Sequence, residues 1–206
     1  MELRDHIEND RLVACSVGAG LPGIEAAALL PERPSRLDRL LALDAWLLLA
    51  MRHWRGPWRT RLALALTRIG DASSWTVAAL AFLGTGSATG ARLGLRLAVA
   101  TLLATAASQT LKRWLLRPRP TRAIAGFTAL AENPDAFSFP SGHTTAAFAV
   151  AAAFTGAGFG LGPASLALAA GIGLSRVYLG AHYPLDVAVG AVLGTACGLA
   201  ARLIGL

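Results

Sequence analysis

Two histidines stand beside other ionisable residues at the edges of long apolar runs in this sequence. His182 is followed four residues later by Asp186, and both belong to the stretch 175–186, which separates two apolar segments. His143 opens another apolar run, at the end of the sequence Pro-Ser-Gly-His at 140–143. Ionisable side chains at membrane depth are costly and usually functional, so these residues are candidates for chemistry.

Three cationic residues accompany the histidines. Lys112 and Arg119 are seven residues apart, and Arg176 is the second residue of the stretch 175–186. The planar guanidinium group of arginine matches two phosphate oxygens at once. Cleavage of a phosphate ester depends mostly on positioning and on charge stabilisation. These residues therefore predict a phosphate-binding site made by Lys112, Arg119 and Arg176.

Ser141 and Gly142 lie where a helix is expected to begin, directly after Pro140. The free N–H groups and the positive dipole end of a helix N-terminus favour an anion. Glycine also allows the backbone to approach a ligand closely. We therefore expect Ser141 and Gly142 to bind the phosphate together with the three cations.

The spacing of His182 and Asp186 suggests how the histidine would be used. A carboxylate at Nδ1 would fix the tautomer of the imidazole and leave Nε2 able to attack, as in catalytic triads. The position of Pro184 suits the start of a helix that carries Asp186.

In chain order, the three stretches read Lys-x6-Arg-Pro at 112–120, Pro-Ser-Gly-His at 140–143 and Ser-Arg-x5-His-x3-Asp at 175–186. This ordered triple resembles the signature of the type-2 phosphatidic acid phosphatase superfamily, which includes the vanadium haloperoxidases. The resemblance implies that His182 is the nucleophile of a phosphohistidine intermediate and that Asp186 orients it. It also implies that His143 protonates the leaving oxygen and then activates water.

The resemblance predicts a metal-independent enzyme that removes the terminal phosphate from a lipid phosphate or diphosphate. A polyprenyl diphosphate, such as undecaprenyl diphosphate, is the first choice of substrate. Phosphatidylglycerophosphate, phosphatidic acid, lipid A and polyprenyl-phosphosugar phosphates stay open, because the motifs contact only the phosphate. A haloperoxidase and a non-catalytic membrane scaffold are the alternatives from other classes. No metal or other cofactor is expected, since the three cationic side chains take the role of a cation.

The composition is typical of a polytopic membrane protein. Of 206 residues, 54% are hydrophobic and 15% are charged, and the apolar residues occur in long runs. The net charge of +7 comes from basic residues that cluster beside these runs. Membrane lipids explain this charge better than nucleic acid, which is excluded as a partner. Cys15 and Cys197 lie in different surroundings, so neither a disulfide nor a metal site is expected.

The apolar runs predict an all-helical membrane bundle of five or six membrane helices, and the resemblance implies a haloperoxidase-like catalytic core. The five expected spans are 62–86, 97–111, 141–159, 161–181 and 184–204. This arrangement brings all three motifs to one face of the membrane. A helix over 40–51 would be about 18 Å long, short of a hydrocarbon core of roughly 30 Å. Because Trp and Arg follow it, an interfacial helix is favoured over a sixth span.

Residues 1–36 are predicted to form a polar, partly ordered leader, and residues 37–206 the membrane-embedded phosphatase domain. In the five-span arrangement the active face carries twelve basic residues and the opposite face three. In the six-span arrangement these numbers become nine and six. The positive-inside rule then favours a cytoplasmic active face, whereas many members of the family that the chain resembles work on the outer face, so both sides stay open. The resemblance implies the bacterial inner (cytoplasmic) membrane, crossed several times.

Two local patterns complete the expectations. Arg68 and Asp71 share a helix face, and a local ion pair is favoured over a role at the substrate entrance. The last span carries glycines at every fourth position, a pattern that allows close backbone contact. Packing within the bundle is favoured over a homodimer contact for these residues, which are Gly190, Gly194 and Gly198.

Overall fold

The computed structural model describes residues 35–131, 135–158 and 160–203. Its elements are α2 (Arg36–Ala50), the 3-10 helix η2 (Met51–Trp54), α3 (Pro57–Ile69), α4 (Ala72–Leu83), α5 (Ala88–Leu115), α6 (Pro120–Ala123), α7 (Gly142–Ala153), α8 (Leu161–Tyr178) and α9 (Pro184–Leu203). Every element in these ranges is a helix, which confirms the predicted all-helical class. The helices belong to the compact unit Leu37–Leu206, whereas the predicted leader lies almost entirely outside the described residues.

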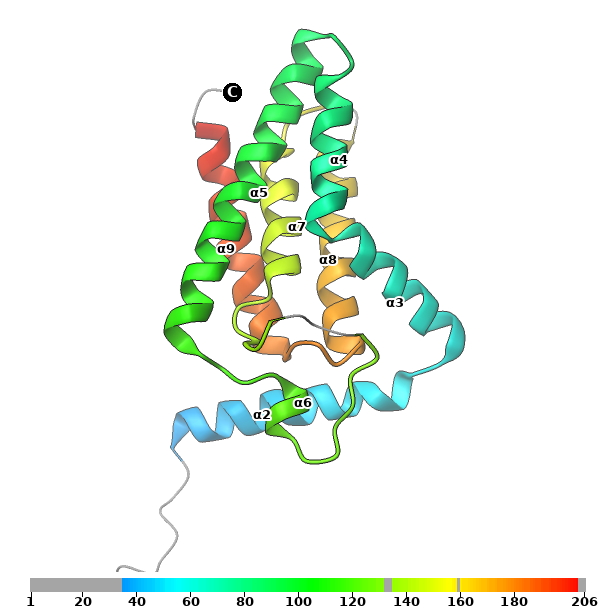
Figure 1. Ribbon diagram of the computed structural model, residues 1–206, viewed down its shortest axis with the longest axis vertical. Helices are drawn as coiled ribbons and strands as arrows, with labels where there is room; N and C mark the ends of the chain where they lie inside the picture. Colours follow the sequence, from blue (N-terminus) through cyan, green and yellow to red (C-terminus); the bar gives the residue numbers. More distant parts are fainter. Residues whose placement is uncertain (1–34, 132–134, 159, 204–206) are drawn as a thin grey trace, which may run out of the picture. The chain divides into compact units, whose positions relative to one another are not determined.

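Helix α7 is the centre of the bundle, and α5, α8 and α9 pack around it (Figure 1). Its sequence is dominated by alanine and threonine, so neighbouring helices can approach its backbone closely. Nine of its residues are buried. Because α7 begins with Gly142 and His143, the tightest part of the bundle fixes the position of the second motif.

The three glycines of α9 lie against α7 and are buried. A Cβ added at Gly194 would overlap the carbonyl oxygen of Thr145, and one at Gly198 would overlap that of Ala149. At Gly190 it would lie 3.0 Å from the carbonyl oxygen of Ser141. These glycines therefore serve packing within the bundle, and their face is not exposed to a second copy of the chain.

The predicted span 62–86 is wrong as a single helix. The helix is interrupted at Gly70, between α3 and α4. A Cβ added at Gly70 would lie 2.9 Å from Cγ2 of Ile172. The indole N–H of Trp75 donates to the carbonyl oxygen of Gly70 at 3.1 Å and fixes the turn. This break matters for the site, because it brings Asp71 to the start of α4.

Other helix boundaries also differ from the prediction. Helix α5 starts well before residue 97, because the side chain of Ser87 accepts a hydrogen bond from Gly90 N–H at 3.0 Å and caps the helix. It ends at Leu115, and Leu116 adopts a left-handed conformation with φ of 49°. Helix α7 ends at Ala153 rather than near 159.

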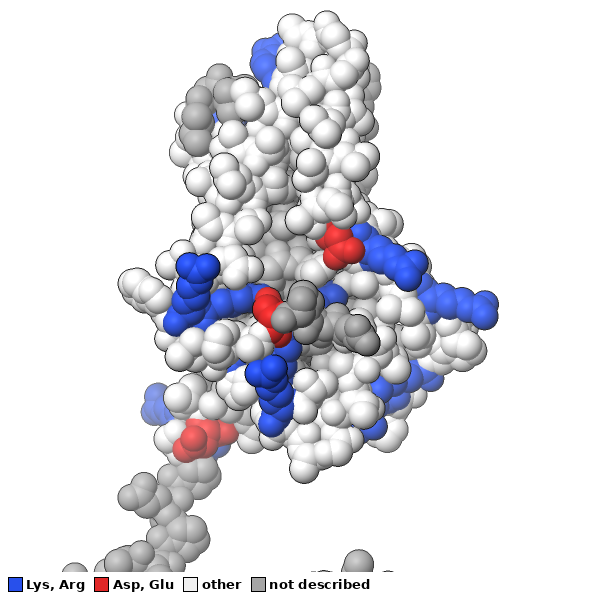
Figure 2. Space-filling view, viewed as in Figure 1, with Lys and Arg blue, Asp and Glu red and all other residues white. Residues whose placement is uncertain are grey.

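Within the described residues, two helices, α5 and α9, are long and apolar enough to cross a membrane, and α4 is a shorter apolar helix. On the face of the molecule that Figure 2 shows, the upper part carries few charged side chains, and Lys and Arg side chains gather over the lower part. In Figure 1, α2 runs crosswise below the ends of the bundle helices. Most of α2 is exposed, including Leu40 and Trp46, and only Asp44 and Leu48 are buried. This orientation agrees with an interfacial helix rather than a sixth span.

Candidate active site

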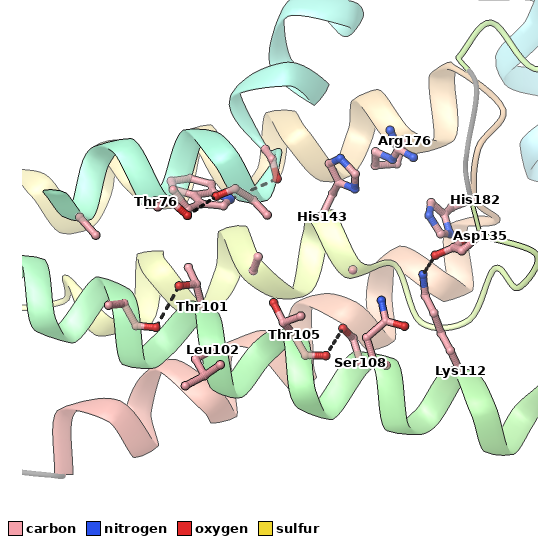
Figure 3. A pocket seen from close by; sticks show the side chains of 18 of the residues that line it. Thr76, Thr101, Leu102, Thr105, Ser108, Lys112, Asp135, His143, Arg176 and His182 are labelled. Carbon is pink, nitrogen blue, oxygen red and sulfur yellow. Dashed lines mark hydrogen bonds and ion pairs between the residues drawn. The ribbon is translucent and has the colours of Figure 1, made fainter. Parts of the chain in front are cut away.

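A cavity of about 600 Å³ is lined by residues of α4, α5, α7 and α8 and of the connections beside them. Figure 3 shows its charged side chains gathered at one end. Six of the eight residues predicted from the sequence line it: Lys112, Arg119, Gly142, His143, Arg176 and His182. The structure thus brings together three motifs that are far apart in the sequence, and the remaining two residues lie behind the cavity wall.

His182 lies on the short connection between α8 and α9, and its side chain is 1% exposed. Gly180, with φ of 77°, allows the chain to turn directly after α8. Nδ1 of His182 faces Oδ2 of Asp186 at 3.5 Å, while Nε2 lies 3.4 Å from Nη1 of Arg119. The nitrogen that faces the cations is therefore Nε2, the one predicted to attack.

The surroundings of His182 keep its imidazole neutral. Burial lowers the pKa of His182 to about 3, the charges of Arg176 and Arg119 act in the same direction, and Asp186 opposes them. At neutral pH the lone pair on Nε2 is thus present for nucleophilic attack. Asp186 is itself fully buried and does not line the cavity, so it reaches the cavity only through His182.

Lys112 and Arg119 form the cationic end of the cavity, and both contact the carboxylate of Asp135. Arg119 also donates from Nε to the carbonyl oxygen of Asp135 and from Nη1 to that of Ala181, each at 2.8 Å. Burial lowers the pKa of Arg119 to about 10, and the charge of Arg176 adds to this effect. Such a concentration of positive charge favours an anion, and a carboxylate takes that place here.

The side chain of His143 contacts Asp71, for which the sequence predicted a different partner, Arg68. Nε2 of His143 lies 2.8 Å from Oδ1 of Asp71 at the start of α4. The predicted ion pair between Arg68 and Asp71 is therefore wrong, because the carboxylate of Asp71 contacts His143 instead. The side chains of His143 and Asp71 are 28% and 48% exposed.

Ser141 does not contribute to the cavity. It is fully buried, and its N–H donates to the carbonyl oxygen of Asp186 at 3.0 Å. Its Oγ accepts a hydrogen bond from Oγ1 of Thr144 at 2.9 Å. The expectation that its backbone N–H would be free for phosphate is therefore wrong, and Ser141 instead joins the start of α7 to the start of α9. Gly142 does line the cavity, where a Cβ would meet only Oγ of Ser108 at 3.8 Å.

Several residues of the site were not identified from the sequence. One of them is Thr67 on α3, whose Oγ1 accepts a hydrogen bond from Arg176. Asp135 sits in an irregular connection that carries no motif. Arg117 contacts both Asp44 and Asp186, behind His182 as seen from the cavity. Only Asp44 carried a signal, since it interrupts an apolar run and so needed a buried partner.

The helical bundle thus brings a His–Asp pair, a second histidine and three cations together around one cavity, an arrangement chemically suited to a phosphate group. Residues 93–205 match the PAP2 superfamily, and the chain belongs to this family. The family membership and the long apolar helices support a membrane location.

Named proteins resemble this chain in sequence and in structure. The decaprenylphosphoryl-5-phosphoribose phosphatase of Mycobacterium tuberculosis is 37% identical over 98 residues, which are 46% of this chain and 51% of that protein. The protein of the same name from Mycolicibacterium smegmatis is 36% identical over 131 residues, 62% of this chain and 69% of that one. The crystal structure of Aquifex aeolicus LpxE superposes with a TM-score of 0.69, at 28% identity, over 78% of this chain and 95% of that one. The chain spans about half the length of the M. tuberculosis protein.

Proposed function

We propose that this protein is a membrane lipid phosphatase that hydrolyses the terminal phosphate of a lipid phosphate or diphosphate. The observation that carries the proposal is that one cavity joins a cationic end to an apolar end. The cationic end contains Lys112, Arg119, Arg176 and the two histidines. The other end is lined by apolar residues of α4 and α5, namely Trp75, Ala79, Leu80, Leu83, Ala98 and Leu102.

The apolar end of the cavity suits a lipid chain. Leu80 and Leu102 line the cavity and yet are 61% and 69% exposed, so it opens sideways between α4 and α5. From Lys112 to Leu102, α5 extends about 15 Å, enough to follow part of a long chain (Figure 3). A chain that comes from the bilayer gains little hydrophobic free energy in such a groove, because lipid tails are as apolar as leucine. The phosphate contacts therefore provide most of the recognition.

In the first chemical step, Nε2 of His182 attacks the phosphorus atom of the terminal phosphate. The bond between phosphorus and the leaving oxygen breaks, and His143 donates a proton to that oxygen. Lys112, Arg119 and Arg176 stabilise the charge on the equatorial oxygens. A substrate phosphate must displace the Asp135 carboxylate, which it can do because it carries more charge and more acceptor oxygens.

In the second step, His143 accepts a proton from water, and the water oxygen attacks phosphorus. The bond between phosphorus and Nε2 of His182 breaks, which releases inorganic phosphate and regenerates the neutral imidazole. No step needs a metal ion, because the three cationic side chains neutralise the phosphate. We therefore expect the phosphatase activity to persist when a chelator such as EDTA is added.

The substrate we favour is a polyprenyl-linked phosphate. Undecaprenyl or another polyprenyl diphosphate remains the first choice. A polyprenyl-phosphosugar phosphate is the second candidate, and the names of the two mycobacterial relatives favour it. Both substrates place a phosphate and a long isoprenoid chain on one molecule, a combination that fits a cavity with one cationic and one apolar end.

We also propose that the chain crosses the bacterial cytoplasmic membrane several times, with its active face towards the cytoplasm. The support is the excess of basic residues near the motifs. Thr128 lies in the connection beside the active site and can be replaced by cysteine. Labelling of Thr128→Cys by an impermeant thiol reagent in intact cells would contradict the cytoplasmic orientation.

The proposed function is tested by phosphate release from the purified full chain in detergent. The panel contains undecaprenyl diphosphate, a polyprenyl-phosphosugar phosphate, phosphatidylglycerophosphate, phosphatidic acid and lipid A, each with and without EDTA. We expect chelator-insensitive turnover of a polyprenyl substrate and a loss of at least about 10^4-fold in His182→Ala. His53→Ala is the matched control, since His53 is exposed on η2 away from the cavity. Full activity of His182→Ala, or no turnover of any lipid, would overturn the proposal.

A further inference from the structure

Behind the nucleophile, Arg117 joins two carboxylates that come from distant parts of the sequence. Its Nη1 lies 2.6 Å from Oδ1 of Asp186, and its Nη2 lies 2.6 Å from Oδ2 of Asp44. Asp44 belongs to α2, Asp186 to the first turn of α9, and Arg117 to the connection after α5. These three side chains therefore connect α2 with the helix that carries the partner of His182.

The three groups are largely withdrawn from water. Their side chains are 6%, 17% and 0% exposed for Asp44, Arg117 and Asp186. Burial lowers the pKa of Arg117, but the two carboxylates outweigh this effect and leave the pKa above its ordinary value, so the guanidinium stays charged. Buried ion pairs are costly to desolvate, and apolar side chains of similar size are often as stable in their place. Stability of the fold alone is therefore a weak reason for this network.

The network holds both oxygens of the Asp186 carboxylate. Oδ1 contacts Arg117, whereas Oδ2 accepts the N–H of Tyr183 at 2.9 Å and faces Nδ1 of His182 at 3.5 Å. A carboxylate held in this way cannot rotate without losing one of these contacts. The direction in which Oδ2 points, and with it the orientation of the imidazole, depends on Arg117.

Arg117 is in turn fixed from several sides. Asp44 binds the guanidinium through Oδ2, and its Oδ1 accepts the N–H of Leu185 at 2.8 Å, at the start of α9. The ring of Tyr183 lies against the guanidinium, 4.0 Å from Cζ to the ring centroid. The carbonyl oxygen of Arg117 accepts the N–H of Ser138 at 2.9 Å. Asp44 is one of only two buried residues that α2 provides.

We propose that Asp44 and Arg117 are positioning residues: they hold Asp186 so that it orients His182, and neither touches the substrate. Neither lines the cavity, which agrees with an action through Asp186. The proposal extends the buried His–Asp pair to a chain of four side chains that ends on α2. It rests on the proposed phosphatase function, because it concerns the geometry of the same nucleophile.

The test is the substitution Asp44→Asn in the full chain, assayed on undecaprenyl diphosphate or on whichever panel lipid the unmodified protein hydrolyses. Asparagine keeps an oxygen for the N–H of Leu185 and removes the charge that holds Arg117. We expect kcat to fall about tenfold and KM to change less than about twofold, because only the geometry of the nucleophile is affected. Asp38→Asn, the same change at an exposed site of α2, is expected to leave kcat unchanged.

A double-mutant cycle distinguishes positioning from general damage to the fold. In an Asp186→Asn background, Asp44→Asn should have no further effect on the rate, since its target is already lost. A loss of equal size in both backgrounds, a loss confined to KM, or an unchanged kcat would each overturn the proposal. If Asp44→Asn does not elute as a monodisperse protein, Arg117→Lys takes its place in the same cycle, because lysine keeps the charge but cannot bridge two carboxylates.

Failure of this inference is distinguishable from failure of the proposed function. If the unmodified protein releases no phosphate from any panel lipid, the phosphatase proposal fails, and the positioning proposal fails with it. If the unmodified protein is active and Asp44→Asn equals it in kcat, only the positioning role is overturned.

Discussion

Each histidine of the site faces an aspartate, but the two pairs differ in burial and in the origin of the partner. His182 and Asp186 are four residues apart, and their side chains are 1% and 0% exposed. His143 and Asp71 are 72 residues apart, and their side chains are 28% and 48% exposed. The first pair belongs to one short segment before and at the start of α9, whereas the second joins α7 to the turn between α3 and α4.

This difference follows the tasks proposed for the two residues. A nucleophile must keep one place and one tautomer during the reaction, so a buried and doubly held partner suits His182. A proton donor must exchange protons with a leaving group and with water, so partial exposure suits His143. We infer that Asp186 acts on the rate through geometry and that Asp71 acts through the proton affinity of His143.

The largest effect that would separate the two pairs is expected for Asp186→Asn. The amide can donate to Nδ1 of His182 and so favour the tautomer that protonates Nε2, which removes the nucleophile. We expect phosphoenzyme formation to slow by about 10^4-fold with little change in KM, by analogy with the same change in a Ser–His–Asp triad. The measurement is single-turnover trapping of phosphohistidine after an alkaline quench. A slowing of less than tenfold would show that the buried pair does not control the nucleophile.

A smaller effect is expected for Asp71→Asn. Without the carboxylate, the protonated form of His143 loses its partner, and we expect phosphoenzyme formation from a lipid phosphate to slow about tenfold. A phenyl phosphate with a nitro group needs no proton on its leaving oxygen, so its phosphoenzyme should form at the same rate in the variant and the unmodified protein. Arg68→Gln, in the next-to-last position of α3, is the control. Equal slowing with both substrates would indicate damage to the cavity instead of impaired proton donation.

The two pairs also differ in how far the sequence revealed them. The contact of His182 with Asp186 follows from a spacing of four residues at a helix start, so it was predictable from local geometry. The contact of His143 with Asp71 depends on the break at Gly70, which lies close to Ile172 of α8. Nothing in the local sequence specifies that contact, and a local partner for Asp71 was therefore expected. Long-range packing determines which of two possible partners a carboxylate reaches.

The same distinction applies to the fold and to the rest of the site. The helical class and the convergence of the three motifs were predictable, because apolar runs and their order determine which ends meet. The boundaries of α5 were not, since capping by Ser87 starts the helix well before the expected beginning at residue 97. The role of Ser141 was missed because its N–H is taken by the carbonyl of Asp186, a contact between two distant segments. Asp44 signalled a buried partner because it interrupts an apolar run, but that partner became recognisable only in the structure, where Arg117 joins Asp44 to Asp186.

The smallest expected effect concerns the charge of His182 itself. Burial lowers its pKa to about 3, so protonation is displaced to lower pH and the imidazole should remain neutral from pH 8 down to pH 5. An ordinary histidine, with a pKa of about 6.5, would be roughly 97% protonated at pH 5. The measurement is a nitrogen NMR titration of the 15N-histidine-labelled protein in detergent, with the signal assigned by its loss in His182→Ala and free histidine as reference. Protonation of His182 near pH 6.5 would mean that water reaches the imidazole. The proposed difference between a buried nucleophile, His182, and a partly exposed proton donor, His143, would then be lost.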